Sequence, residues 1–262
     1  MEAMVEGQLV AYDEAGEGTP LVLIHGYPLT RRLWEPQLRE LAAHARVIAL
    51  DLWGFGGSAA VGEATMGTYA DQVRALMDEL SIGRAVVGGL SMGGYITFEF
   101  FRRYSNRVAG LIFANTKAGP DSAEARAGRD QSAELAREKG VDAIAAAMLP
   151  KLLSPGAYAG NRGVVLTAEG IMRGSTVEGI VAALGAMRDR PDSTPTLQWI
   201  DRPTLVIGGK DDQLIPPAES EKIAGGVRGG RLEMLPDAGH LSNLEQADLF
   251  SRAVGDFLKK VG

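Results

Sequence analysis

The sequence contains no cysteine and only three histidines among its 262 residues. Disulfide bonds and thiol chemistry are therefore excluded, and a histidine-rich zinc cluster cannot be assembled from His25, His44 and His240. No apolar run approaches the roughly 18 residues that a membrane helix needs. The amino terminus also lacks the basic and apolar regions of a signal peptide. These absences predict a cytoplasmic protein without a bound metal ion.

An excess of positive charge is missing as well. Lysine and arginine total 27 against 33 aspartates and glutamates, which gives a formal net charge of −6 at pH 7. This balance disfavours nucleic acids and anionic membrane surfaces as partners. The expected partner is a small molecule that is uncharged or weakly anionic.

What the sequence does contain is 45% hydrophobic residues, arranged as short apolar runs that alternate with helical patterns. This alternation is typical of βαβ units and a parallel sheet, and the chain length suits a single α/β domain. The runs that we interpret as strands are 9–12, 21–24, 47–50, 85–87, 111–114, 204–207 and 231–235.

Residues 69–80 form the clearest amphipathic helix, with Thr68 and Asp71 as its expected capping pair. The alternation then breaks over residues 119–196, where helical patterns and prolines occur without a strand pattern. We expect a core of residues 1–118 and 197–262 with a helical cap of residues 119–196.

Ser91 lies at the centre of Gly-Gly-Leu-Ser-Met-Gly-Gly, between the apolar run 85–87 and a helical pattern at 95–104. A serine on a sharp strand-to-helix turn is the arrangement called a nucleophile elbow. Gly89 and Gly93 suit this turn because a Cβ at either position would collide with the neighbouring backbone. The motif alone is a weak signal, so the interpretation of Ser91 as a nucleophile depends on finding a histidine and an acidic residue to act with it.

Two further motifs supply those partners. Asp211 and Asp212 follow the run 204–207, and His240 follows the run 231–235. The order serine, aspartate, histidine places all three at the carboxyl ends of strands, where open α/β sheets hold their chemistry. A histidine, whose ordinary pKa is about 6.5, can take the serine proton, and a carboxylate behind it fixes the tautomer.

Five motifs together carry a resemblance to a known family. They are His25-Gly26-Tyr27-Pro28 and the segments 51–58, 89–93, 209–216 and 239–245. The whole chain resembles the α/β-hydrolase superfamily, in particular small bacterial carboxylesterases and the 3-oxoadipate enol-lactonase-like group. The resemblance implies a mostly parallel, eight-stranded sheet with helices on both faces and a cap inserted after the sixth strand. Relatives that attack alkyl halides or epoxides carry an aspartate on the elbow, so Ser91 argues against both activities.

The resemblance also assigns site residues. The spacing from Gly209 to Pro216 is common in such hydrolases and favours Asp212 over Asp211, which is then a turn residue. Backbone N–H groups of Met92 and Tyr27 are the expected oxyanion hole. His25 is expected to brace its loop as a buried histidine and not to act as a base.

The cap residues carry two open interpretations. An acyl pocket is expected to be lined by Met148, Leu149, Leu152 and Leu184. Such apolar stripes serve equally often only to pack a cap against the core. Arg126, Arg129 and Arg137 form a solvated face, or else one of them meets a substrate carboxylate.

The leading hypothesis is a cofactor-independent serine hydrolase that cleaves carboxylic esters or lactones, acyl-homoserine lactones included, through an acyl-enzyme. A second hypothesis uses the same triad for perhydrolysis or C–C bond hydrolysis. A third is a ligand receptor on a hydrolase fold, which would complete at most a few turnovers. The fold alone does not choose the substrate.

Overall fold

The computed structural model describes residues 1–261, and its centre is one eight-stranded sheet in the order β1-β2-β4-β3-β5-β6-β7-β8. The strands β4, β3, β5, β6, β7 and β8 pair in parallel, whereas β1 and β2 pair antiparallel at one edge. The expected α/β-hydrolase sheet is therefore confirmed. The strands are β1 (Glu2–Val5), β2 (Gln8–Ala15), β3 (Pro20–Ile24), β4 (Arg46–Leu50), β5 (Ala85–Leu90), β6 (Val108–Ala114), β7 (Thr204–Gly209) and β8 (Arg231–Leu235).

The edge strand β1 is the one strand that the apolar runs did not indicate. It has four residues, and only Ala3 and Val5 are buried while Glu2 and Met4 face outward. A run this short carries little periodic signal. Its pairing with β2 depends on residues that lie further along the chain.

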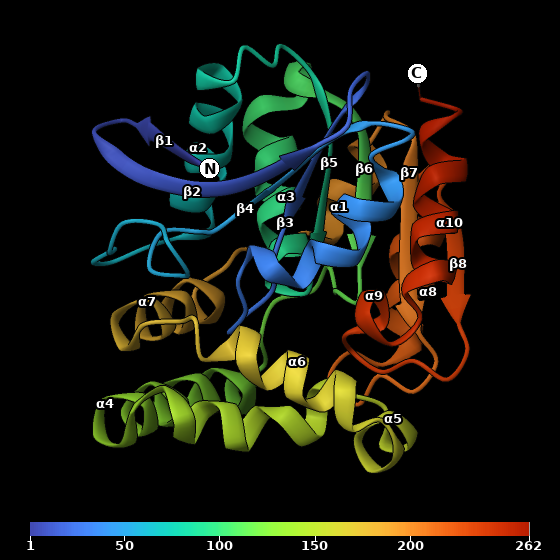
Figure 1. Cartoon of the computed structure of the whole chain (residues 1–262). Helices are drawn as coiled ribbons and strands as arrows, with labels where there is room; N and C mark the ends of the chain where they lie inside the picture. Colours follow the sequence, from blue (N-terminus) through green and yellow to red (C-terminus); the bar gives the residue numbers. More distant parts are fainter. Residues whose placement is uncertain (262) are drawn as a thin grey trace.

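Helices cover both faces of the sheet, as expected (Figure 1). Val87 of β5 packs in the hydrophobic cluster that includes Tyr69 and Phe98, whereas Val86 packs in the cluster that includes Phe250. Neighbouring strand residues point to opposite faces, so each face has its own core. The core helices are α1 (Glu35–Leu41), α2 (Met66–Glu79), α3 (Met92–Tyr104), α8 (Pro217–Gly226), α9 (Ser242–Glu245) and α10 (Ala247–Leu258), with short 3₁₀ helices at Arg31–Trp34, Ser105–Arg107 and Thr194–Trp199.

Helix α2 begins earlier than expected, and its predicted cap is wrong. Thr65 is the N-cap, and its hydroxyl accepts from the Thr68 N–H at 3.0 Å. The Thr68 hydroxyl in turn accepts from the Thr65 N–H at 3.2 Å, so Thr68 fills the role that glutamate usually has in a capping box. Asp71 instead pairs with Arg103 at 2.8 Å.

The segment between β6 and β7 is helical. It contains α4 (Ala123–Leu152), α5 (Pro155–Gly160), α6 (Arg162–Met172) and α7 (Val177–Arg188). Figure 1 shows these helices together beneath the sheet, at the end toward which β8 points. The insertion after the sixth strand is thus confirmed, while the exact division at residues 119 and 196 stays a prediction. Every helix in the described chain is too short or too polar to traverse a lipid bilayer.

Candidate active site

Ser91 occupies the sharp turn between β5 and α3. Its backbone has φ 57° and ψ −114°, a conformation that residues with a side chain rarely adopt. A Cβ on Gly89 would lie 2.1 Å from the carbonyl carbon of Gly93, and one on Gly93 would lie 2.2 Å from the Ile24 oxygen. Both glycines are therefore required by close backbone approach, as predicted. Ser91 itself stays partly exposed.

Asp212 and His240 form a buried pair. The Nδ1 atom of His240 lies 2.8 Å from the Asp212 Oδ2 atom, and the two side chains are 2% and 1% exposed. Since an ionised carboxylate only accepts, Nδ1 donates this bond, and Nε2 is the nitrogen left for a serine proton. Asp211 is exposed to solvent. The geometry therefore supports the choice of Asp212.

Further donors hold the Asp212 carboxylate. Its Oδ1 atom accepts from the N–H groups of Leu214 and Ile215, each at 2.9 Å. Burial opposes the charge, but His240 and these hydrogen bonds together hold the pKa of Asp212 below its usual range. The Asp212 carboxylate is thus ionised at neutral pH, where it can accept the hydrogen bond that orients the His240 imidazole.

This lowered pKa predicts a pH-dependent contribution to stability. An aspartate has a pKa of about 3.9 when unfolded, so Asp212 stabilises the folded state above about pH 4 and loses this effect as the pH falls through its lower folded pKa. The unfolding free energy of wild type should exceed that of Asp212→Asn by a constant amount near neutral pH and by less in acid. Urea unfolding between about pH 3 and 7 measures the difference, with Asp211→Asn as control. A difference that persists undiminished in acid would contradict this account.

Ser91 and His240 follow β5 and β8 at the same carboxyl edge of the sheet. Within residues 1–261 no hydrogen bond joins the Ser91 hydroxyl to His240. Such bonds are often loose in unliganded enzymes and tighten around the substrate. The roles of the two residues as nucleophile and base stay predictions.

Asn115 was missed by the sequence analysis. It follows β6 with a positive φ of 45°, and its buried Nδ2 group donates to Asp212 Oδ2 at 2.9 Å and to the Gly239 oxygen at 3.1 Å. It therefore links the acid to the loop that carries His240. The sequence could have indicated Asn115, because it is a polar residue directly after the apolar run 111–114, at the end of a predicted strand.

Glu245 is a second support that received no predicted role. One carboxylate oxygen accepts from the Gly239 N–H and the other from the Ser154 N–H, each at 2.9 Å. Burial raises its pKa, although these bonds oppose the shift. Glu245 thus ties the His240 loop to the residue that precedes α5.

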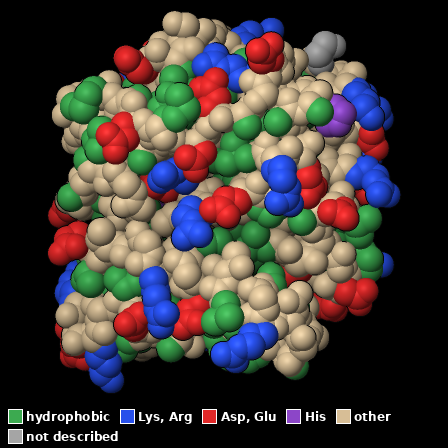
Figure 2. Space-filling view, in the orientation of Figure 1, with side chains coloured by type: hydrophobic (Ala, Val, Ile, Leu, Met, Phe, Trp, Pro, Cys, Tyr) green, Lys and Arg blue, Asp and Glu red, His purple; other side chains and the backbone are tan. Residues whose placement is uncertain are grey.

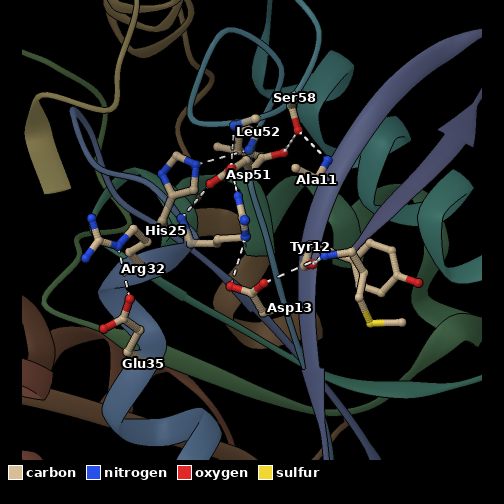
Figure 3. Close-up of polar contacts among 12 residues, drawn as sticks. Ala11, Tyr12, Asp13, His25, Arg32, Glu35, Asp51, Leu52 and Ser58 are labelled. Carbon is tan, nitrogen blue, oxygen red and sulfur yellow. Dashed lines mark hydrogen bonds and ion pairs between the residues drawn. The ribbon is translucent and has the colours of Figure 1, made fainter.

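The loop after β3 is braced by His25, as expected. The His25 Nε2 atom accepts from the Leu52 N–H at 3.1 Å, so Nδ1 is the donor to the Gly26 oxygen at 2.8 Å. Burial lowers the pKa of His25, which favours this neutral form. Figure 3 shows the bond from Leu52 beside Asp51, which accepts from the Arg31 N–H at 2.7 Å. Both ring nitrogens are occupied, so His25 is structural.

The expected oxyanion donors lie on this loop and on α3. Met92 is the first residue of α3, and the N–H groups of a first helical turn have no acceptor within the helix. A Cβ on Gly26 would lie 3.2 Å from the Ser91 Cβ, so the loop that continues into Tyr27 passes beside the serine. The oxyanion hole of Tyr27 and Met92 stays a prediction.

A cavity of about 1240 Å³ lies between α4, α7, α3 and residues 61–67. Leu184 lines it, whereas Leu149 and Leu152 are buried in the hydrophobic core and Met148 packs beside them. Ser91 is not among the lining residues, so this cavity is not itself the reaction centre. The acyl-pocket role of these four residues stays a prediction. On the face drawn in Figure 2, acidic and basic side chains are interspersed and form no single basic patch.

Known proteins resemble this chain in sequence and in fold. A family model described as the alpha/beta hydrolase family matches residues 21–253. The chain is 30% identical to a 3-oxoadipate enol-lactonase of Acinetobacter baylyi, over 87% of this chain and 84% of that protein. A malate-bound thermophilic esterase from Thermogutta terrifontis superposes with a TM-score of 0.96 at 38% identity, covering 100% of this chain and 98% of that one. The enol-lactonase of Burkholderia xenovorans LB400 gives a TM-score of 0.91 at 31% identity, covering 99% and 100%.

These matches confirm the resemblance to bacterial esterases and enol-lactonases that the motifs indicated. They span the sheet, the serine turn and the helical insertion alike. On this combination of sequence match, fold and site, the chain belongs to the alpha/beta hydrolase family.

Proposed function

We propose that this chain is a serine hydrolase that cleaves carboxylic esters or lactones through an acyl-enzyme. The observation that carries the proposal is the buried pair of Asp212 and His240, at the same sheet edge as the strained turn of Ser91. A serine hydroxyl needs a base to become nucleophilic at neutral pH, and an oriented imidazole is that base.

The reaction proceeds in two halves. The Ser91 Oγ atom attacks the ester carbonyl carbon while His240 Nε2 takes its proton, and the N–H groups of Met92 and Tyr27 stabilise the oxyanion. His240 then returns the proton to the leaving alkoxide as the C–O bond breaks, which leaves the acyl group on Ser91. Water, deprotonated by His240, attacks the acyl carbon, and the carboxylic acid departs as Ser91 regains its proton. No step requires a cofactor.

The similar proteins support this substrate class. Three of the similar proteins are named as one esterase and two enol-lactonases, and a lactone is a cyclic carboxylic ester. We propose residues 119–196 as the cap that covers Ser91 and selects among such substrates, with Met148, Leu149, Leu152 and Leu184 on its apolar side.

A substrate panel tests the proposal. Ethyl esters of increasing acyl length, simple lactones and acyl-homoserine lactones are each incubated with the protein, and product is followed over many enzyme equivalents. We expect continuous turnover of at least one ester or lactone. Product formation that stops near one equivalent would indicate a receptor, and turnover confined to C–C bonds or peracid formation would replace the proposed reaction.

A further inference from the structure

The short segment 114–116, at the carboxyl end of β6, contacts the turn of Ser91. The Ser91 N–H donates to the Ala114 oxygen at 2.9 Å, and the Thr116 hydroxyl donates to the Ser91 carbonyl oxygen at 2.8 Å. Thr116 is 1% exposed, and a Cβ on Gly94 would lie 2.5 Å from its hydroxyl oxygen. The segment therefore binds both backbone polar groups of the strained serine turn.

The side chain of Asn115 extends this segment to the acid. Its Nδ2 group donates to Asp212 Oδ2 at 2.9 Å and to the Gly239 oxygen at 3.1 Å. Its Oδ1 atom accepts from the Ser242 hydroxyl. Because a carboxylate and a backbone carbonyl only accept, they fix the orientation of the amide. Both ends of the Asn115 amide are thus bound, to the acid and to the two sides of the loop that carries His240.

The backbone of Asn115 fixes the direction of that side chain. Its φ of 45° lies in the left-handed region, which asparagine tolerates better than most residues with a side chain. Its N–H donates to the Ile207 oxygen of β7 at 2.8 Å, and the residue is 1% exposed. Glycine would fit this backbone but would make none of the side-chain bonds. The position therefore suits asparagine in both conformation and chemistry.

Asn115 is an uncharged donor among acidic groups. Asp212 Oδ2 accepts from Asn115 and from His240 Nδ1 alike, and Glu245 accepts from the loop that carries His240. Burial raises the pKa of Glu245 and of Tyr95 on α3, and the charge of Asp212 adds to both shifts. A carboxyl group in place of the Asn115 amide would set a like charge against Asp212, and two carboxylates this close oppose each other's ionisation.

We propose that the segment 114–116 is the common support of the nucleophile and the acid. Thr116 positions the turn of Ser91. Asn115 positions the Asp212 carboxylate and sets the lower pH limit of the reaction. This inference rests on the proposed function and adds two positioning residues to it. The topology explains the arrangement, because β6 lies between β5, which leads to the serine, and β7, which leads to the acid.

Asn115→Asp tests the acid side, because it keeps the shape and the backbone preference but replaces a donor with a second carboxylate. The added negative charge should hold a proton on the imidazole to higher pH. The acid limb of kcat/KM for the best ester or lactone should therefore move up by about 1 to 3 pH units. Asn106→Asp adds the same charge at an exposed position and should leave the limb in place. A folded Asn115→Asp protein with the wild-type pH profile would overturn the role of Asn115.

Titration of the His240 ring protons by NMR is a second readout, and it needs no substrate. The chain has three histidines, so the His240 resonances can be assigned by their loss in His240→Gln. The titration midpoint should move to higher pH in Asn115→Asp and stay in place in Asn106→Asp. If the midpoint moved but wild type turned over no ester or lactone and Ser91 took no fluorophosphonate label, the proposed function would fail while the contact of Asn115 with the acid stood.

Two uncharged variants test positioning without a charge change. Thr116→Val removes the hydroxyl that binds the Ser91 turn, and it should lower kcat by about 10-fold without moving the acid limb. Asn115→Gly keeps the left-handed backbone, deletes the side-chain bonds and should lower kcat by about 10- to 100-fold at an unchanged KM. It also decides the role of Asn115 if Asn115→Asp does not fold. A folded variant with wild-type kcat would show that the residue it replaces is structural only.

Discussion

Replacing Ser91 with alanine is expected to lower kcat by about 10⁴- to 10⁶-fold, by analogy with other serine triads. The reason is that the turn at φ 57° presents one hydroxyl at the carboxyl edge of the sheet, and the substitution removes the attacking atom. Alanine keeps the Cβ, so the turn itself should survive. The measurement is kcat on the best substrate of the panel.

A fluorophosphonate gives a second, independent measurement. It should label wild type at one site, Ser91, and leave Ser91→Ala unlabelled, as detected by intact mass. Ser105→Ala, at an exposed serine after α3, is the control and should be labelled and active like wild type. If Ser91→Ala kept most of its activity, Ser91 would not be the nucleophile.

The second large effect is expected at Asp212. Asp212→Asn should lower kcat by about 10⁴-fold, whereas Asp211→Asn should remain within a few fold of wild type. An asparagine NH₂ at 2.8 Å from His240 Nδ1 would donate where the carboxylate accepts. The imidazole would then carry its proton on Nε2, which could no longer accept the serine proton.

The two substitutions share a charge change, so each controls for the other. Thermal unfolding of both variants separates a catalytic loss from a folding loss, because Asp212 also holds the Leu214 and Ile215 amides. If Asp211→Asn were the inactive variant, the acid role would move to Asp211 and the buried hydrogen bond between Asp212 and His240 would be structural.

The donors around Asp212 explain how its carboxylate stays ionised in a buried site. Asn115 reaches it from β6, and Glu245 fixes the loop of His240 against the cap segment at Ser154. A carboxylate in a low-dielectric site stays charged only when donors surround it. These contacts come from four separate parts of the chain, which is why no local motif revealed them.

Local signals in the sequence determined the sheet, the elbow and the order of the site residues. The buried runs of β3 to β7 are nearly continuous because both faces of these parallel strands are covered, whereas the edge strand β8 is only partly buried. Gly89 could be interpreted because its constraint is the backbone of Gly93, a few residues away, whereas the carbonyl that constrains Gly93 belongs to Ile24 of β3. His240 and the aspartates were found because each lies in the loop that follows a strand-like run.

The contacts that each side chain makes come from the tertiary structure. Asp211 and Asp212 have the same chemistry, and although the spacing to Pro216 favoured Asp212, its contact with His240 depends on the packing of β7 beside β8. Arg129 has the helical spacing of a solvated face, yet both it and the distant Arg190 pair with the buried carboxylate of Asp121. Partners of this kind are brought together by long-range packing, which a pattern of neighbouring residues does not encode.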